Sequence, residues 1–145
     1  MVIDWDTVHD APEFSLCVKG QTIEGKIVSV YDGDTVKIIF PLNDVLYKWN
    51  CRLAGIDTPE LRTSCQDEKT YGYTVRDVLR EKVLNKVIQA KCGELDKYGR
   101  LLVEIHIGNE NVNQWLIDSN YAFTYNGGTK KSWKEYFENK NNLEN

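Results

Sequence analysis

The stretch RLAGIDTPE, residues 52–60, places one guanidinium and two carboxylates at the end of an apolar, strand-like run. Carboxylates bind hard cations and arginine binds phosphate oxygens, so this composition suits a site for a metal and a phosphate. The ordinary alternative is a helix N-terminus, with Asp57 and Glu60 as a capping box around Pro59. A capping box should introduce an amphipathic helix, yet residues 61–69 show no apolar periodicity. The sequence therefore favours a site at a strand end beside a loop.

Two further stretches carry residues of the same kinds. DGDT, residues 32–35, is by itself a good hairpin turn, because Asp-Gly between apolar runs favours turns with positive φ. Turn chemistry does not require the second carboxylate, Asp34, after the turn is made. DKYGR, residues 96–100, is likewise an ordinary turn that ends in Arg100. Their spacings from the first stretch match no local metal-ligand rule, so each alone gives weak support for a site.

Short strands and helices must position these residues. Apolar and β-branched residues predict two strands within residues 22–40, joined at Asp32-Gly33, and a third strand over residues 47–56. Residues 61–69 are expected to form an exposed loop.

The second half of the chain changes pattern. Apolar residues at helical spacing predict a helix over residues 70–85. Strands are predicted over residues 86–92 and 100–107, followed by a short helix from about Asn111 and a final helix after the glycines of YNGG.

This order of elements places the chain in the α+β class, mainly β. It suits a five-stranded, closed barrel of the oligonucleotide-binding (OB) type with three helices. An open α+β sheet with helices on one face fits the pattern nearly as well. We expect one domain, residues 21–141, after an acidic leader, residues 1–20.

Composition excludes several classes of function. The net charge of −4 and pI near 5.2 argue against a generic nucleic-acid coat protein, although a small basic cleft remains compatible with them. The leader holds four carboxylates against one lysine, which accounts for −3 of that charge. With only two histidines, the chain has poor material for histidine-driven hydrolysis.

The four cysteines form no C-x-x-C pair, which argues against structural zinc and a disulfide framework. Free, mostly buried thiols are expected at Cys17, Cys51, Cys65 and Cys92. The sequence has no pattern of a signal peptide or a membrane span, so we expect an intracellular protein without membrane partners.

Taken together, three stretches resemble the staphylococcal nuclease (thermonuclease) family. They are VYDGDTVKI, CRLAGIDTPE and DKYGR, in that order, with the predicted helix between the last two. The segment VNQWLIDSNYA after the fifth strand also matches, so the resemblance covers roughly residues 22–125. The family fold is a five-stranded OB barrel with three helices, which agrees with the fold predicted from the pattern.

The resemblance implies Ca²⁺-dependent hydrolysis of phosphodiester bonds in DNA and RNA. Single strands would be preferred, and the 5′ oxygen would leave to give 3′-phosphate ends. It implies that Asp34 and Asp57 bind Ca²⁺ through their carboxylates and Thr58 through its backbone carbonyl. It further implies that Glu60 activates the attacking water.

The remaining roles concern the substrate. The resemblance implies that Arg52 and Arg100 grip the scissile phosphate, and that Lys97 and Tyr98 contact the nucleotide. Three aromatic residues lie near the family's base pocket without aligning cleanly. They are Tyr121, Phe123 and Tyr125, of which Tyr125 is our candidate for substrate binding.

Two other functions stay open at this point. A catalytically silent module on the same barrel would hold nucleic acid or protein without cutting; such members usually lack part of the acidic and arginine set, which is complete here. A structural or interaction protein would leave these converging charges unexplained. The expected partner is DNA or RNA, with no obligate protein partner and a monomeric chain.

Overall fold

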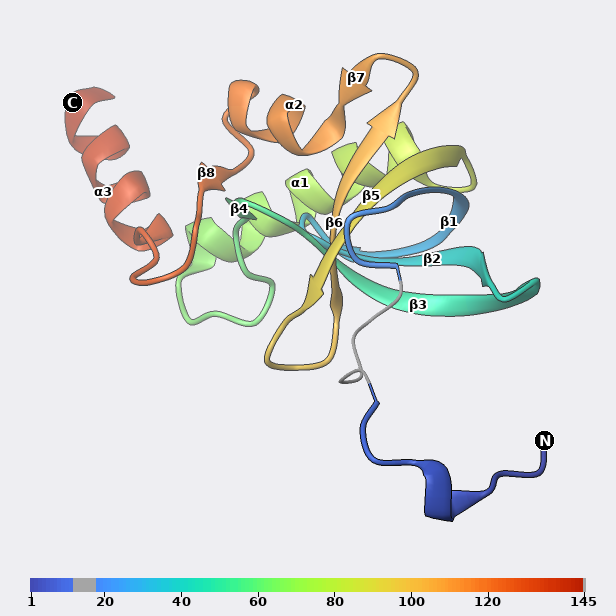
Figure 1. Ribbon diagram of the computed structural model, residues 1–145. Coiled ribbons are helices and arrows are strands. Elements are labelled where there is room, and N and C mark those ends of the chain that lie inside the picture. Colours follow the sequence, from blue (N-terminus) through green and yellow to red (C-terminus); the bar gives the residue numbers. More distant parts are fainter. Residues whose placement is uncertain (12–17, 145) are drawn as a thin grey trace.

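The structure of the protein is a computed structural model that describes residues 1–11 and 18–144. The acidic leader predicted over residues 1–20 falls partly outside these ranges, because Glu13 and Cys17 lie outside the described residues. The N-terminal segment that is described is exposed throughout and extends away from the folded body in Figure 1.

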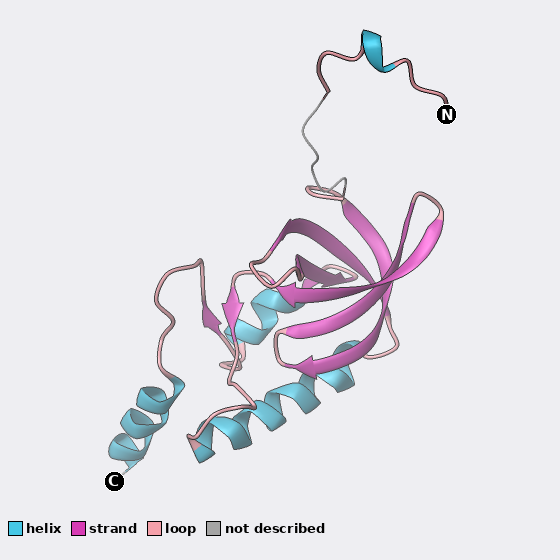
Figure 2. Cartoon of the chain, turned by 90° about the horizontal axis from the view of Figure 1, so that it is seen from below, coloured by secondary structure: helices cyan, strands magenta, loops and turns pink. Residues whose placement is uncertain are grey.

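Five strands form a closed barrel, as predicted (Figures 1 and 2). They are β1 (Thr22–Asp32), β2 (Thr35–Leu42), β3 (Val45–Leu53), β5 (Val87–Leu95) and β6 (Leu101–Ile107). Sheet neighbours pair antiparallel in the order β3-β2-β1-β5-β6. In addition, β3 pairs in parallel with β6, with Leu53 opposite Val103. This pairing joins the two ends of the sheet, so the open-sheet alternative is wrong.

The barrel interior follows the period-two pattern of the sequence. Along β6, Leu101, Val103 and Ile105 are fully buried, whereas the residues between them are half-buried. The helix α1 (Gln66–Val83) adds Val75 and Leu79 to the same core. The apolar face that predicted this helix is therefore the face that packs against the barrel.

The first turn of α1 lies inside the segment that we expected to be an exposed loop. The helix begins at Gln66 and ends at Val83, instead of spanning residues 70–85. Its first turn contains only polar residues, so no apolar period marks it, and acidic residues at a helix N-terminus are favoured by the helix dipole. Residues 58–65 form no helix, which excludes the capping-box interpretation of Asp57 and Glu60.

The β1–β2 turn differs from the expected Asp32-Gly33 turn. The turn residues are Gly33 and Asp34. None of Asp32, Gly33 and Asp34 has positive φ. Glycine is needed there for space: a Cβ on Gly33 would lie 2.6 Å from Val75 Cγ1 and 2.9 Å from Thr58 Cβ. The glycine therefore lets the turn approach α1 and Thr58.

The remaining elements lie outside the five barrel strands. They are η1 (Trp5–Thr7), β4 (Ile56–Asp57), β7 (Glu110–Asn111), α2 (Val112–Asp118), β8 (Phe123–Thr124) and α3 (Trp133–Glu144). The strand predicted over residues 47–56 breaks at Gly55, where φ is +78, and β4 then pairs with β8. Two-residue strands are too short for the period-two pattern to reveal them.

Three described cysteines carry free thiols, as predicted. Cys51 and Cys92 are buried and Cys65 is half-buried. Burial raises the pKa of the Cys51 thiol to about 12, which keeps it protonated and unreactive.

Within residues 1–11 and 18–144, no helix combines the length and the apolar character that a membrane crossing requires.

Candidate active site

Asp34 joins three parts of the fold. It is the second residue of the β1–β2 turn and is 7% exposed. Its Oδ2 accepts a hydrogen bond from the backbone N–H of Thr58 at 3.3 Å and an ion-pair contact from Arg52 Nη2 at 3.4 Å. The backbone N–H of Leu53 donates to the Asp34 carbonyl at 2.8 Å. The β1–β2 turn, the end of β3 and the segment after β4 thus meet at Asp34.

A second carboxylate, that of Asp32, contacts the backbone of Asp34. Its Oδ1 accepts a hydrogen bond from the backbone N–H of Asp34 at 3.1 Å. Burial, and then the neighbouring charge of Asp34, raise the pKa of Asp32. Sequence reasoning treated Asp32 only as a turn residue, because an Asp before Gly already has that ordinary explanation.

Asp57 lies in β4 and is 3% exposed. Lys130 Nζ lies 3.2 Å from Asp57 Oδ1. Burial raises the pKa of Asp57, and the Lys130 ammonium opposes that shift. No motif pointed to Lys130, which stands in an aperiodic segment after two glycines and contacts Asp57 only through the fold.

Glu60 is held by its backbone while its side chain stays exposed. Its N–H donates to Glu68 Oε2 at 2.9 Å, and Glu68 Oε1 accepts from Thr63 Oγ1 at 3.2 Å. Partial loss of hydration next to the protein surface, and then the charge of Asp34, raise the pKa of the Glu60 carboxyl. The first turn of α1, missed by the sequence pattern, is therefore the part that fixes Glu60.

Arg100 is clamped by Asp96 in the turn between β5 and β6. Arg100 Nε donates to Asp96 Oδ2 at 2.8 Å, and Asp96 Oδ1 accepts the backbone N–H groups of Tyr98 and Arg100 at 2.9 Å each. Arg100 Nη1 also donates to Thr35 Oγ1 at 3.3 Å, which in turn donates to Asp34 Oδ1 at 3.3 Å. Asp96 was missed, although an Asp that begins a turn commonly accepts the N–H two residues on.

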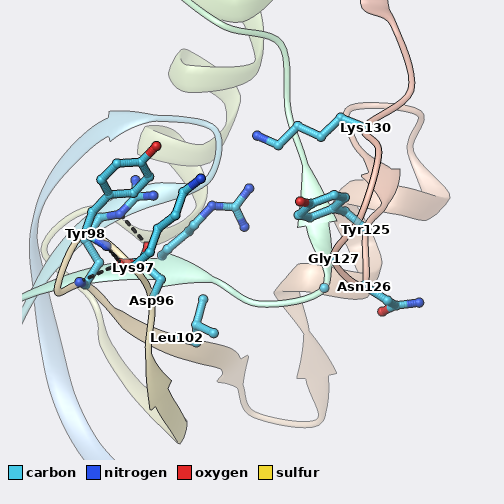
Figure 3. Close-up of a pocket in the computed structure, with 11 residues that line it drawn as sticks. Asp96, Lys97, Tyr98, Leu102, Tyr125, Asn126, Gly127 and Lys130 are labelled. Carbon is cyan, nitrogen blue, oxygen red and sulfur yellow. Dashed lines mark hydrogen bonds and ion pairs between the residues drawn. The ribbon is translucent and has the colours of Figure 1, made fainter.

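Figure 3 shows the cavity beside these groups, with a volume of about 610 Å³. Lys97 and Tyr98 form one wall, and Tyr125 and Lys130 face them from the segment after β8. The predicted arginines line the same cavity. Arg52 Cζ lies 5.9 Å from the Tyr125 ring centroid, and Arg100 Cζ lies 5.4 Å from that of Tyr98.

Of the three aromatic residues left open by the sequence, only Tyr125 lines this cavity. Tyr121 packs 5.8 Å from Trp115, and Phe123 stacks on Trp133 at 4.0 Å, centroid to centroid. These two residues belong to the packing between helices and lie away from the cavity lining.

The donor chemistry fits a hard cation. Asp34 and Asp57 are buried carboxylates, and the buried hydroxyl of Thr58 has no hydrogen-bond partner among the described residues. An all-oxygen donor set is what Ca²⁺ prefers, with water or substrate oxygens filling the shell. Across the described ranges, no group of three or more His, Cys, Asp or Glu side chains is arranged to hold a metal ion. The protein itself thus offers two carboxylates beside a cation-lined cavity.

Comparison with known proteins gives an independent result. Residues 50–144 match the family described as staphylococcal nuclease homologue. An uncharacterized protein of Methanocaldococcus jannaschii is 33% identical over 125 residues, which cover 70% of this chain and 58% of that protein. An uncharacterized endonuclease of Escherichia coli is 32% identical over 113 residues, 77% of this chain and 67% of that protein. A thermonuclease of Staphylococcus hyicus is 28% identical over 99 residues, 67% of this chain and 56% of that protein. The chain therefore spans between about half and two thirds of these relatives.

Proposed function

The chain belongs to the staphylococcal nuclease family, and from this membership we propose that it hydrolyses phosphodiester bonds in DNA and RNA with Ca²⁺ bound. Single strands are the preferred substrate, and the 5′ oxygen leaves to give 3′-phosphate ends. One observation carries the proposal: Arg52 and Thr58 converge on the Asp34 carboxylate, and Arg100 reaches the same carboxylate through Thr35.

The metal half of the site consists of oxygen donors. Asp34 and Asp57 would hold Ca²⁺, with Thr58 beside them. When bound, the ion supplies positive charge that polarises phosphate and orients water. The contact from Lys130 to Asp57 means that this ammonium and the cation compete for one carboxylate.

The phosphate half consists of cations held in fixed positions. Hydrolysis of a diester builds extra negative charge on the phosphorus oxygens in the transition state. Arg52 and Arg100 place guanidinium forks where that charge develops, and such forks stay charged at any working pH. Because Asp34 and Asp96 already orient them, little reorganisation is needed when substrate binds.

Glu60 is the group that accepts a proton from the attacking water. Its raised pKa makes the carboxylate a somewhat better base than an ordinary glutamate, and its exposed side chain can reach a water beside the phosphate. The hydrogen bond from the Glu60 N–H to the Glu68 carboxylate holds the backbone of Glu60 in place.

Substrate contacts outside the phosphate come from the cavity walls. Tyr98 is 71% exposed and Tyr125 faces it across the cavity, so both rings are available to bases. Lys97 adds a charge that suits a terminal or flanking phosphate.

The test is cleavage of a labelled single-stranded DNA and a matched RNA, with Ca²⁺ and with a chelator. Wild-type protein should cut both only with Ca²⁺, and Glu60→Gln should lower the rate by roughly 10²–10⁴-fold. Glu24→Gln, an exposed change on β1, is the matched control and should cut normally. Folded wild-type protein that cuts neither substrate with any divalent metal would instead identify a silent binding module.

A further inference from the structure

A second hollow, of about 650 Å³, shares no lining residue with the first cavity. Its wall includes residues 61–63, which follow Glu60 directly, together with Tyr31 at the end of β1 and one face of α1. Four cations line it, and no carboxylate does. They are Arg62, Lys69, Arg76 and Arg80. In a chain with a net charge of −4, such a gathering needs an explanation.

Two of the cations are held by the protein. Arg80 Nε and Nη2 donate to the carbonyl oxygen of Val30 at 3.1 and 3.0 Å, which fixes this guanidinium against β1. Arg76 Nη2 lies 3.0 Å from Asp77 Oδ1, and Arg80 Nη1 lies 3.9 Å from the same atom. Asp77 therefore offsets part of the charge of these two arginines.

The other two cations have no such partner. Among the described residues, the side chains of Arg62 and Lys69 form no hydrogen bond or ion pair. Lys69 is half-buried, and no described carboxylate forms an ion pair with its ammonium. Charged residues along an exposed helix usually form only a solvated face. Here residues 61–63 and Tyr31 flank the charged residues of α1, so that together they line a hollow.

Two tyrosines complete the lining. Tyr31 is 50% exposed and Tyr73 is 40% exposed. The Arg76 guanidinium carbon lies 4.6 Å from the Tyr73 ring centroid, which presents a cation and a ring together. Exposed aromatic rings among cations are the composition that binds single-stranded nucleic acid, because bases stack on the rings and phosphates meet the charges.

We propose that this hollow binds the nucleic-acid strand on the far side of the scissile phosphate from the first cavity. The inference rests on the proposed function, because the strand must run past Glu60 to reach both. A dinucleotide would fill the first cavity alone, whereas a longer strand would occupy both. The protein would therefore favour cleavage within strands that extend on both sides of the cut.

The test measures binding by the folded Glu60→Gln protein, which should cut its ligand roughly 10²–10⁴-fold more slowly than the wild type. Fluorescence anisotropy would compare a dinucleotide with a single strand of roughly 12 nucleotides, over a series of salt concentrations. The variant is Arg62→Gln with Lys69→Gln in that background. The control is Lys37→Gln with Lys48→Gln, two exposed changes on β2 and β3 that line neither cavity.

The long strand should bind the variant about tenfold more weakly, and its salt slope should fall by about 1.4, at about 0.7 for each lost phosphate contact. The dinucleotide should bind as before, and the control should change neither ligand. Tyr73→Ala should also weaken the binding of the long strand alone. Because this change leaves all four cations in place, the loss would measure stacking of a base on the Tyr73 ring.

An unchanged affinity for the long strand would overturn the inference, as would an equal loss for the dinucleotide. A polyglutamate peptide that binds as tightly as the long strand would assign the hollow to acidic proteins instead. If the Glu60→Gln protein binds neither oligonucleotide, the proposed function fails with the inference. If it binds both, and Arg62→Gln with Lys69→Gln changes nothing, the inference alone fails.

Discussion

Among single residues, the two cavity arginines are held in different ways. Arg52 is 8% exposed and pairs with Asp34, while its Nη1 donates to the carbonyl of Leu53 at 3.2 Å. Arg100 is half-buried and depends on the Asp96 clamp. Loss of Arg52 would leave the buried Asp34 carboxylate without its ion-pair partner and so lower the stability of the fold. A change at Arg100 should instead affect mainly substrate binding and turnover.

Arg100→Lys should therefore lower turnover by roughly 10²–10³-fold, because a point charge cannot replace the guanidinium fork. The free energy of unfolding should change by less than about 1 kcal/mol, as expected for a partly exposed ion pair. Steady-state cleavage of single-stranded DNA and urea unfolding measure the two effects. Near-normal turnover would refute the role assigned to Arg100.

At the level of elements, one tyrosine connects α1 to the end of the chain. The Tyr71 ring lies 5.8 Å from that of Trp133 and 5.6 Å from that of Phe137, both in α3. Its hydroxyl donates to the carbonyl of Asn120 at 2.8 Å, just before β8. This contact helps to position the segment that carries Tyr125.

Tyr71→Phe should lower the free energy of unfolding by about 1 kcal/mol at neutral pH, through loss of that hydrogen bond. Burial raises the pKa of Tyr71 from 10.0 to about 12, so the folded state keeps a proton that the unfolded state releases. The contribution of Tyr71 to the free energy of unfolding is therefore fully present below pH 10.0 and is lost as the pH rises toward 12. The difference between the two proteins should shrink over that range in urea unfolding; a constant difference would contradict the shift.

The β1–β2 turn offers a second test at this level. Gly33→Ala should lower the free energy of unfolding by about 1–3 kcal/mol, because the new Cβ would overlap Val75 and Thr58. Activity should fall as well, since Thr58 and Asp34 would shift. Gly93→Ala is the control, because a Cβ there would lie 3.4 Å from the Leu102 carbonyl oxygen and 3.7 Å from Leu102 Cβ, which are ordinary contact distances. Equal effects from both changes would contradict the packing argument.

The sequence predicted those elements whose pattern repeats, and it pointed to those candidate site residues that lie in motifs. β6 and the apolar face of α1 have such patterns, so both were predicted. The first turn of α1 and the pairing of β4 with β8 have no period, and they form because distant segments meet. Lys130 and the clamp by Asp96 were missed for the same reason, since each acts through a contact that spacing alone does not reveal.

On the scale of the whole molecule, charge is divided unevenly. The chain carries −4 overall, yet each of the two hollows is lined by four lysine or arginine side chains. A polyanion such as nucleic acid would be attracted to the cations in these two hollows. The negative net charge would repel it from the rest of the surface and so limit non-specific binding. Affinity for nucleic acid should therefore depend on these local sites more than on total charge.

Ligands that bind only the folded molecule should raise its melting temperature. Ca²⁺ together with a nucleotide bisphosphate should raise it more than either alone, because Asp34 and Asp57 would hold the ion and a phosphate would supply further oxygen ligands. Asp57→Asn should lose the part that depends on Ca²⁺, and Mg²⁺ should replace Ca²⁺ poorly because it demands stricter octahedral geometry. Differential scanning calorimetry measures these shifts. Absence of a shift with both ligands would favour a structural protein.

Closure of the barrel by β3 and β6 also sets an order in time. Residues 51–53 leave the ribosome well before their partners, residues 101–103. A nascent chain thus carries Asp34 and Asp57 first, without Arg100 and without the strand that holds the barrel shut. Because such non-local pairing must wait for the later segment, the complete site arises only late in translation. The proposed nuclease site therefore stays incomplete on the ribosome until residues 101–103 have emerged and paired with β3.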